Sequence, residues 1–430
     1  MSKKLLSVLG LLLALTLLAA GCGGGEAEPG DTGTTPADTG TAPADTGTEE
    51  MTDTGTEDMT DTGTEDMTET ETGAAPVGDC GDAVKIAYQG PLTGPNAALG
   101  INMLNGLQLA VDEANESGEL DFMVEIESLD SQGDPAVAPP LAQGAAADES
   151  VVAVVGPAFS GETAASGPIY EEAGLPFLSP SATNPDLSQN GWEYFFRTVA
   201  TDATQGPVAA RFIYENLGAT QVAVVDDASE YGKGLADIVE QSLTENGATI
   251  VLREGVEAGT QDYSAVVGQI AQSGAEAMFY GGYFSDAGLI RRQLVDNGAG
   301  DITFVSDDGA FDNALVEVAG ADAAEGLWVT FPGADPLSAD PAFLEAYNAA
   351  FDADPGAFTI EAYQSGLILT QALQEVGCDR TAIRDFLDEF SAEVFGKQIE
   401  FDDNGDIAAQ TFFVYQVENG AFVQQEEVQA

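Results

Sequence analysis

Apolar runs rich in β-branched residues alternate with longer amphipathic stretches from residue 83 onward. The runs predict strands at 84–89, 123–129, 151–155, 176–178, 221–225, 249–253, 277–280 and 303–306. The longer stretches carry apolar residues at spacings of three and four and predict helices at 100–115, 161–172, 205–216, 232–245, 263–272 and 287–296. Because strands alternate with helices, the pattern predicts α/β architecture, with parallel sheets covered by helices on both faces.

The predicted strands fall into two groups around Phe195. Four precede it and four follow it, which favours two doubly wound sheets, each at the centre of one lobe. The length of the segment 80–430 also fits about two domains. One large doubly wound domain is the alternative.

The first 22 residues have a different pattern. Lys3 and Lys4 precede the largely apolar run Leu5–Ala20, which is typical of an export signal and short for a membrane-spanning helix. The ending Leu18-Ala19-Ala20-Gly21-Cys22 resembles a bacterial lipobox. We therefore expect a signal peptide at 1–22 and lipidation of Cys22; a plain cleaved signal is the alternative.

Residues 23–79 consist mainly of Thr, Gly, Pro, Ala and acidic residues, and the unit Asp-Thr-Gly-Thr occurs five times. With so few apolar side chains, burial cannot offset the entropy of ordering the segment, so we expect a disordered tether. Asp-Thr-Gly also occurs in aspartic proteases, but that chemistry needs two such aspartates held close together in a folded site. The repeat in this segment favours the tether.

The charge of the chain excludes several functions. Of its 73 acidic and 12 basic residues, 57 and 10 respectively lie in 80–430, so nucleic acid and anionic lipid surfaces are repelled. Such an acidic surface suits a saline habitat. The chain has no histidine, the commonest base at neutral pH and the commonest metal ligand, which disfavours catalysis and a metal site. We expect no cofactor.

Two loops that follow predicted strands carry hydroxyl groups. The loop 156–161 contains Ser160, and the loop 179–185 contains Ser181 and Thr183. In parallel sheets, ligands bind beyond the carboxyl ends of the strands, and hydroxyls and helix amides bind a carboxylate well. Ser160 also suits the role of a helix cap and Thr183 that of a turn residue, and the residues alone leave both readings open.

An ordered series of motifs resembles the branched-chain amino acid (leucine/isoleucine/valine) binding proteins of ABC transporters, within the type I periplasmic binding proteins. Besides the two loops, the motifs include Gly90-Pro91-Leu92-Thr93-Gly94, Phe196-Arg197-Thr198, Gln205-Gly206-Pro207, Tyr231-Gly232-Lys233-Gly234 and Tyr280-Gly281-Gly282-Tyr283. The resemblance covers 83–425. It implies an extracytoplasmic, lipid-anchored, monomeric binding protein that delivers a small amino acid to the permease subunits.

The same resemblance implies two discontinuous lobes that close by a hinge of three chain crossings. Lobe 1 would comprise 80–200 and 332–410, and lobe 2 would comprise 201–331 and 411–430. The crossings would fall near 198–204, 329–335 and 408–411.

The resemblance also implies a ligand site. Ser160 and Thr183 would hold the carboxylate, while the Ser181 carbonyl, the Thr183 hydroxyl and Asp308 would hold the ammonium. Asp307 is the alternative acid, and both aspartates could instead merely begin a helix. The side-chain walls would be Leu99, Phe159, Ala182, Tyr231, Tyr283 and Phe358.

Two cysteines follow Cys22, and an exported protein with such a pair is first examined for a disulfide. In the implied fold, Cys80 and Cys378 reach the same pole of lobe 1, so we expect them to be bonded. The acidic run 402–406 is similar to a calcium loop, but it lacks the glycine and glutamate that such a loop requires and favours a hairpin turn.

Four rival functions remain. A sensor of amides or amino acids with the same fold, or a binder of another small carboxylate, would use the same loops. A hydrolase would need a nucleophile elbow, and the sequence has no Gly-x-Ser-x-Gly. An adhesin on a threonine-rich stalk would bind no amino acid.

Overall fold

The computed structural model describes residues 80–408 and 411–429. The expected signal peptide, the lipidation site Cys22 and the expected tether all lie outside these residues.

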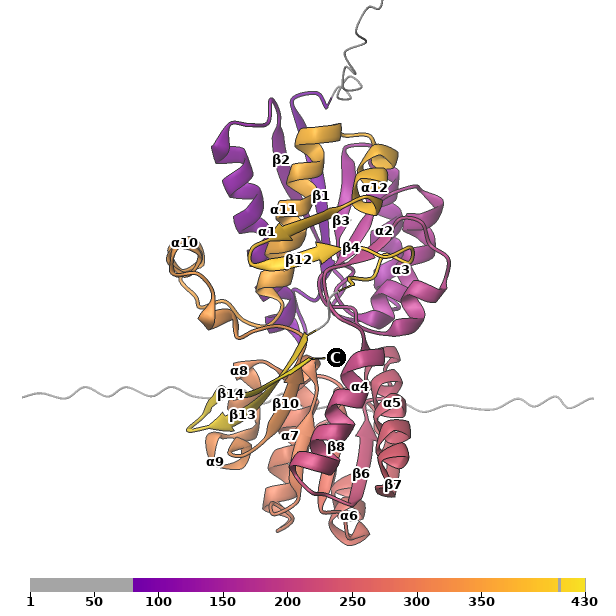
Figure 1. Ribbon diagram of the computed structural model, residues 1–430, viewed down its shortest axis with the longest axis vertical. Helices are drawn as coiled ribbons and strands as arrows, with labels where there is room; N and C mark the ends of the chain where they lie inside the picture. Colours follow the sequence, from indigo (N-terminus) through magenta and orange to yellow (C-terminus); the bar gives the residue numbers. More distant parts are fainter. Residues whose placement is uncertain (1–79, 409–410, 430) are drawn as a thin grey trace, which may run out of the picture. The chain divides into compact units, whose positions relative to one another are not determined.

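The first sheet has five parallel strands in the order β2-β1-β3-β4-β5 (Figure 1). Their bounds are β1 Ala83–Gly90, β2 Met123–Asp130, β3 Val151–Val155, β4 Phe177–Ser179 and β5 Phe195–Arg197. Alternate side chains point to opposite faces of a strand. Thus Ala87 and Phe177 pack with α2 (Ala138–Ala147) and α3 (Ser160–Glu172). Ile86 and Leu178 belong to the core formed with α1 (Ala97–Ser117), α11 (Thr359–Val376) and α12 (Arg380–Asp388).

The second sheet has seven strands in the order β14-β13-β10-β9-β8-β6-β7. Its parallel part comprises β6 Gln221–Asp226, β7 Thr249–Gly255, β8 Ala277–Gly281, β9 Thr303–Ser306 and β10 Trp328–Phe331. The antiparallel pair β13 Thr411–Glu418 and β14 Ala421–Gln429 extends it beyond β10.

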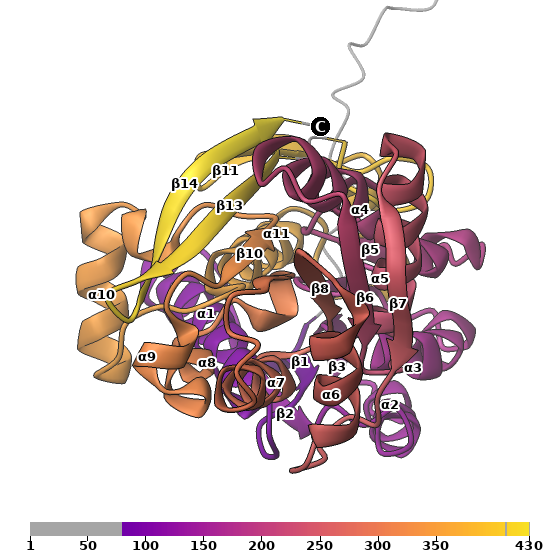
Figure 2. The same ribbon diagram turned by 90° about the horizontal axis from the view of Figure 1, so that it is seen from below.

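Helices cover both faces of this second sheet, as Figure 2 shows. On one face, Val222 and Phe279 pack with α4 (Asp202–Arg211) and α5 (Glu230–Asn246). On the other, Val225 and Met278 pack with α6 (Ser264–Ser273), α7 (Phe284–Asp296) and α8 (Asn313–Ala319). The short helix α9 spans Ala321–Ala324. The predicted architecture of two doubly wound lobes is therefore confirmed, and the alternative of one large domain is wrong.

The chain returns to the first sheet after β10. It forms α10 (Pro341–Phe351), α11 and α12, and then the hairpin β11 (Ser391–Val394) and β12 (Lys397–Glu400). Cys80, just before β1, is bonded to Cys378, just after α11, with 5.5 Å between their Cα atoms. The expected disulfide is thus present.

Two predictions at the level of elements were wrong. The sequence predicted four strands in each sheet, whereas the structure has five and seven. It also predicted one helix over 205–216, whereas α4 ends at Arg211 and a π-helical turn, Phe212–Asn216, follows. The Leu217 N–H donates to the Phe212 carbonyl at 3.0 Å, the bond across five residues that closes this π-helical turn.

Candidate functional site

A closed cavity lies between the carboxyl ends of the two sets of parallel strands. Its walls come from both lobes: Leu99, Phe159, Ser160, Ser181, Tyr231, Tyr283, Asp308, Gly309 and Phe358. Its volume is about 10 Å³, counted as the space that the centre of a water-sized sphere can reach, and this is room for about one water. Any larger ligand therefore requires these side chains to move or the lobes to part. Eight of the ten predicted site residues line this cavity.

Ser160 does not have the capping role that its sequence position suggested. It is the first residue of α3, Phe159 occupies the cap position, and no side-chain bond caps the helix. The Ser160 hydroxyl instead accepts a hydrogen bond from the backbone N–H of Asn184, at 3.2 Å. The prediction of a serine cap is wrong, because this hydroxyl joins the loop after β3 to the loop after β4.

The loop after β4 divides its side chains between the cavity and the core. Ser181 lines the cavity, and its hydroxyl donates to the Ala158 carbonyl at 2.6 Å. Ala182 packs with Leu187 and Phe195 in the core of lobe 1 and is not among the lining residues. Thr183 is also outside the lining set; its buried hydroxyl forms no hydrogen bond of good geometry.

Asp308 is the acid that faces the cavity. Its Oδ1 accepts a hydrogen bond from the Tyr231 hydroxyl at 2.7 Å, and that hydroxyl accepts one from the Gly309 N–H at 3.0 Å. Burial raises the pKa of Asp308 to about 6, although the bond from Tyr231 opposes the shift. The neighbouring Asp307 points elsewhere, because its Oδ2 accepts from the Gly282 N–H at 2.9 Å. Of the two candidate acids, Asp308 lines the cavity and Asp307 does not.

Asp202 is a second acid beside the cavity, and the sequence analysis missed it. It begins α4, is fully buried, and neither carboxylate oxygen forms a hydrogen bond of good geometry. Burial and then the charge of Asp308 raise its pKa well above the usual value, while the Thr183 hydroxyl and Arg197 oppose the shift. An acid in the first turn of a helix is so common that the sequence offered no signal for it.

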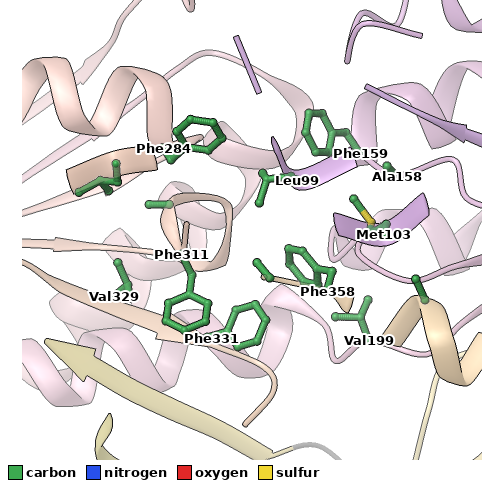
Figure 3. Packing of buried hydrophobic residues seen from close by; sticks show 14 of the residues in the cluster. Leu99, Met103, Ala158, Phe159, Val199, Phe284, Phe311, Val329, Phe331 and Phe358 are labelled. Atoms are coloured by element: carbon green, nitrogen blue, oxygen red, sulfur yellow. The ribbon is translucent and has the colours of Figure 1, made fainter. Parts of the chain in front are cut away.

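The apolar walls of the cavity cross from one lobe to the other. The ring of Phe159 stacks on that of Tyr283 with 4.2 Å between centroids, and Tyr231 lies 5.3 Å from Tyr283. Figure 3 shows Leu99, Phe159 and Phe358 within the same buried cluster. A ligand between these rings would bury its side chain in an apolar pocket.

Two polar contacts also join the lobes directly. The Asn184 Nδ2 donates to the Glu230 carbonyl at 2.9 Å, and the Asn102 Nδ2 donates to Asp312 Oδ2 at 3.2 Å. They stabilise the closed arrangement of the two lobes.

Residues 83–421 match the model of the family described as periplasmic binding protein. The chain belongs to this family. It is 31% identical over 340 residues to the leucine-, isoleucine-, valine-, threonine- and alanine-binding protein of Pseudomonas aeruginosa, covering 78% of this chain and 90% of that protein. It is 32% identical over 346 residues to the leucine-specific-binding protein of Salmonella typhimurium, covering 79% and 92%.

A solved structure shares the same fold. The branched-chain amino acid transporter substrate binding protein LivJ from Streptococcus pneumoniae, in complex with isoleucine, matches with a TM-score of 0.75 at 29% identity. The match covers 81% of this chain and 100% of that one. Family membership confirms the resemblance seen in the sequence and the expectation of a binding protein rather than an enzyme. Within the described part of the chain, no helix has the length and apolar character needed to cross a membrane.

Proposed function

We propose that this protein captures a small aliphatic amino acid of the branched-chain class between its two lobes and delivers it to an ABC transporter. The observation that carries the proposal is the combination in one cavity of the hydroxyls of lobe 1, the buried Asp308 of lobe 2 and aromatic walls. Relatives named for binding leucine, isoleucine and valine support the same ligand class.

Each end of an amino acid has a suitable partner in this site. Ser160 and Thr183 bind the carboxylate, for which hydroxyls and backbone amides are good donors. The Ser181 carbonyl, the Thr183 hydroxyl and Asp308 bind the ammonium. Asp308 provides the counter-charge without which a buried ammonium would cost several kcal/mol. Asp202 is a second acid nearby, although its raised pKa favours the neutral form in the ligand-free site.

The side chain of the ligand lies against Leu99, Phe159, Tyr231, Tyr283 and Phe358, with Ala182 supporting the loop from the core. Binding requires the closed cavity to open, and we propose a hinge at the three crossings predicted from the sequence. The lobes are then 80–200 with 332–410, and 201–331 with 411–430.

We further propose that the mature protein is a monomer anchored outside the cell membrane through a lipid on Cys22, with 23–79 as its tether. The lipid would keep the binding protein beside the permease. Replacing Cys22 by Ser should release the protein from the membrane fraction into the soluble extracytoplasmic fraction.

Calorimetric titration tests the ligand class. The panel comprises leucine, isoleucine, valine, alanine and phenylalanine, together with the α-keto acids that match the first three. We expect binding of aliphatic amino acids and no comparable binding of keto acids, which lack the ammonium. Equal affinity for both kinds of ligand would contradict the role given to Asp308, and no binding at all would contradict the function.

A further inference from the structure

Arg197 is a buried cation that contacts the backbone of the loop after β4, the loop that carries Ser181 and Thr183. Its side chain is 0% exposed. Its Nη1 donates to the carbonyls of Ala182 and Asn184, both at 2.9 Å, and its Nη2 donates to the Ser188 hydroxyl at 3.0 Å. The two carbonyls belong to the residues on either side of Thr183, so one guanidinium holds the peptide units 182–183 and 184–185 around a proposed ligand contact.

Asp406 in turn holds Arg197. Its Oδ1 accepts from the Arg197 Nε at 2.5 Å, and its Oδ2 accepts from the Ser188 hydroxyl at 2.9 Å. A guanidinium bound by a carboxylate has a fixed plane, and its remaining donors then point in fixed directions. The orientation of the loop 182–184 therefore depends on a residue more than 200 positions away in the sequence.

The turn that carries Asp406 is the acidic run that is similar to a calcium loop. Here the Asp402 carboxylate accepts from the N–H groups of Asn404 and Asp406, at 2.8 and 3.1 Å, and so shapes the turn. Gly405 has a φ of +78°, and a Cβ there would lie 2.0 Å from the Phe195 carbonyl oxygen. Only glycine allows the turn to approach β5 this closely, and the Arg197 N–H donates to the Gly405 carbonyl at 2.9 Å.

We propose that Arg197 and Asp406 are positioning residues for the ligand carboxylate, and that the turn 402–406 belongs functionally to the binding site although it touches no ligand. This inference rests on the proposed function. The pair holds the loop 181–184 in its binding geometry before the ligand arrives, so that binding does not have to order it.

The test compares Arg197 with Arg380, since each of these arginines donates hydrogen bonds to backbone carbonyls. Arg380 donates to the carbonyls of Ala146, Asp148 and Val151, at the amino end of β3 and away from the cavity. Each is replaced separately by lysine, which keeps the charge but loses the planar fork. Leucine affinity is measured by calorimetry on the full chain, well below the melting temperature of each variant.

We expect Arg197→Lys to raise the Kd for leucine about tenfold or more, and Arg380→Lys to change it less than about twofold. Asp406→Asn should give a smaller increase in the same direction, and it serves as the second variant if Arg197→Lys does not fold. A lower melting temperature without a loss of affinity in Arg197→Lys and Asp406→Asn would overturn the proposal, because that result describes a purely structural role.

Hydrogen exchange of the ligand-free protein separates this inference from the proposed function. Arg197→Lys should speed amide exchange in peptides covering 181–188, whereas Arg380→Lys should speed it around 146–151. If the wild-type protein bound no amino acid, the proposed function would fail while this measurement still tested the positioning role. Unchanged exchange at 181–188 in Arg197→Lys would refute that role whatever the ligand is.

Discussion

Glu162 is a buried carboxyl group behind the Phe159 wall of the cavity. It lies in the first turn of α3 and is fully buried, its Oε1 accepts from the Ser131 hydroxyl at 2.7 Å, and its Oε2 has no partner. Burial raises its pKa to about 8, against the effect of that bond and of the nearby backbone N–H groups of Phe159 and Ala158. At neutral pH this side chain is therefore mainly a neutral acid.

The linkage between this proton and folding gives a first prediction. The folded protein holds the proton up to about pH 8, whereas the unfolded chain releases it near its ordinary pKa of 4.5. The folded state thus binds more protons in this window, and the free energy of unfolding falls as the pH rises from about 4.5 to about 8. The Glu162→Gln variant has no such proton to lose. Its free energy of unfolding, compared with that of the wild type, should therefore increase by on the order of 4 kcal/mol between about pH 4.5 and about pH 8.

Urea unfolding at pH 5 and pH 8 measures the effect. Glu172→Gln is the matched control, because it removes an exposed acid from the same helix and should leave the pH dependence of wild type unchanged. A difference between Glu162→Gln and wild type that stays constant with pH would show that the carboxyl group is already ionised when folded.

Asp308 gives a second prediction, for binding. Its pKa of about 6 applies to the ligand-free site, where it faces the hydroxyl of Tyr231 and the neighbouring acids Asp202 and Asp307. A bound ammonium favours the ionised form, so binding releases protons. The Kd for leucine should therefore rise about tenfold for each pH unit below 6 and level off above it.

Calorimetry in two buffers of different ionisation enthalpy counts the released protons. Asp308→Asn should bind weakly and lose most of this pH dependence, whereas Asp286→Asn, which removes a buried acid of lobe 2 that does not line the cavity, should keep it. A pH-independent Kd between 5 and 7 in the wild type would contradict the pairing of Asp308 with the ammonium.

Asp308 and Asp202 also illustrate what the sequence could predict at this scale. Asp308 follows a predicted strand within a recognisable motif, so both its place and its chemistry were accessible. Asp202 approaches the cavity only because the chain turns into α4 after Thr201 and the Asp202 N–H donates to the Thr183 carbonyl at 3.0 Å. No local pattern encodes that approach. Arg197 belongs to the recognised motif Phe196-Arg197-Thr198, but nothing in the sequence indicated its contacts with the loop after β4.

At the scale of elements, the periodic pattern identified eight strands and six helices, and it missed elements of every length, from the three residues of β5 to the eighteen of α11. All eight predicted strands are present, with ends that differ by a residue or two. The strands β5 and β10, of three and four residues, were missed, although β4 and β9 have the same lengths and were predicted. The pair β13 and β14 joins the second sheet next to β10, a strand some eighty residues earlier in the chain. Such pairing depends on tertiary contacts and not on local pattern.

The contact between α1 and the start of α8 gives a third prediction. The Asn102 side chain of α1 donates to Asp312, the cap residue of α8, across the two lobes. One hydrogen bond contributes about 1 kcal/mol, so Asn102→Ala should weaken closure and raise the Kd for leucine about fivefold, although Asn102 does not line the cavity.

Asn115 offers a control within the same helix. It exchanges hydrogen bonds with the backbone of Val124 inside lobe 1, at 2.9 Å each, so Asn115→Ala should lower the melting temperature and leave the Kd nearly unchanged. If the two variants shifted the Kd equally, the contact between the lobes would have no specific part in closure.

At the scale of the whole molecule, the acidic charge is almost uncompensated at the surface. Arg197 and Arg291 are buried. Four other basic residues are already paired with carboxylates: Lys85, Lys233, Arg253 and Arg384. Arg380 binds backbone carbonyls. Most of the positive charge in 80–430 therefore serves local structure, and the remaining acids repel one another across the surface.

This repulsion gives the last prediction. Raising sodium chloride from 0.01 to 0.3 M shortens the Debye length from about 30 Å to well under 10 Å, which screens repulsion between surface carboxylates. The melting temperature at pH 7 should therefore rise steeply over this range and flatten towards 1 M. Stabilisation by exclusion of salt from the surface would instead continue to grow in proportion to concentration. A melting temperature independent of salt below 0.3 M would mean that the folded chain tolerates its charge without screening, and the acidic surface would then be no sign of a saline habitat.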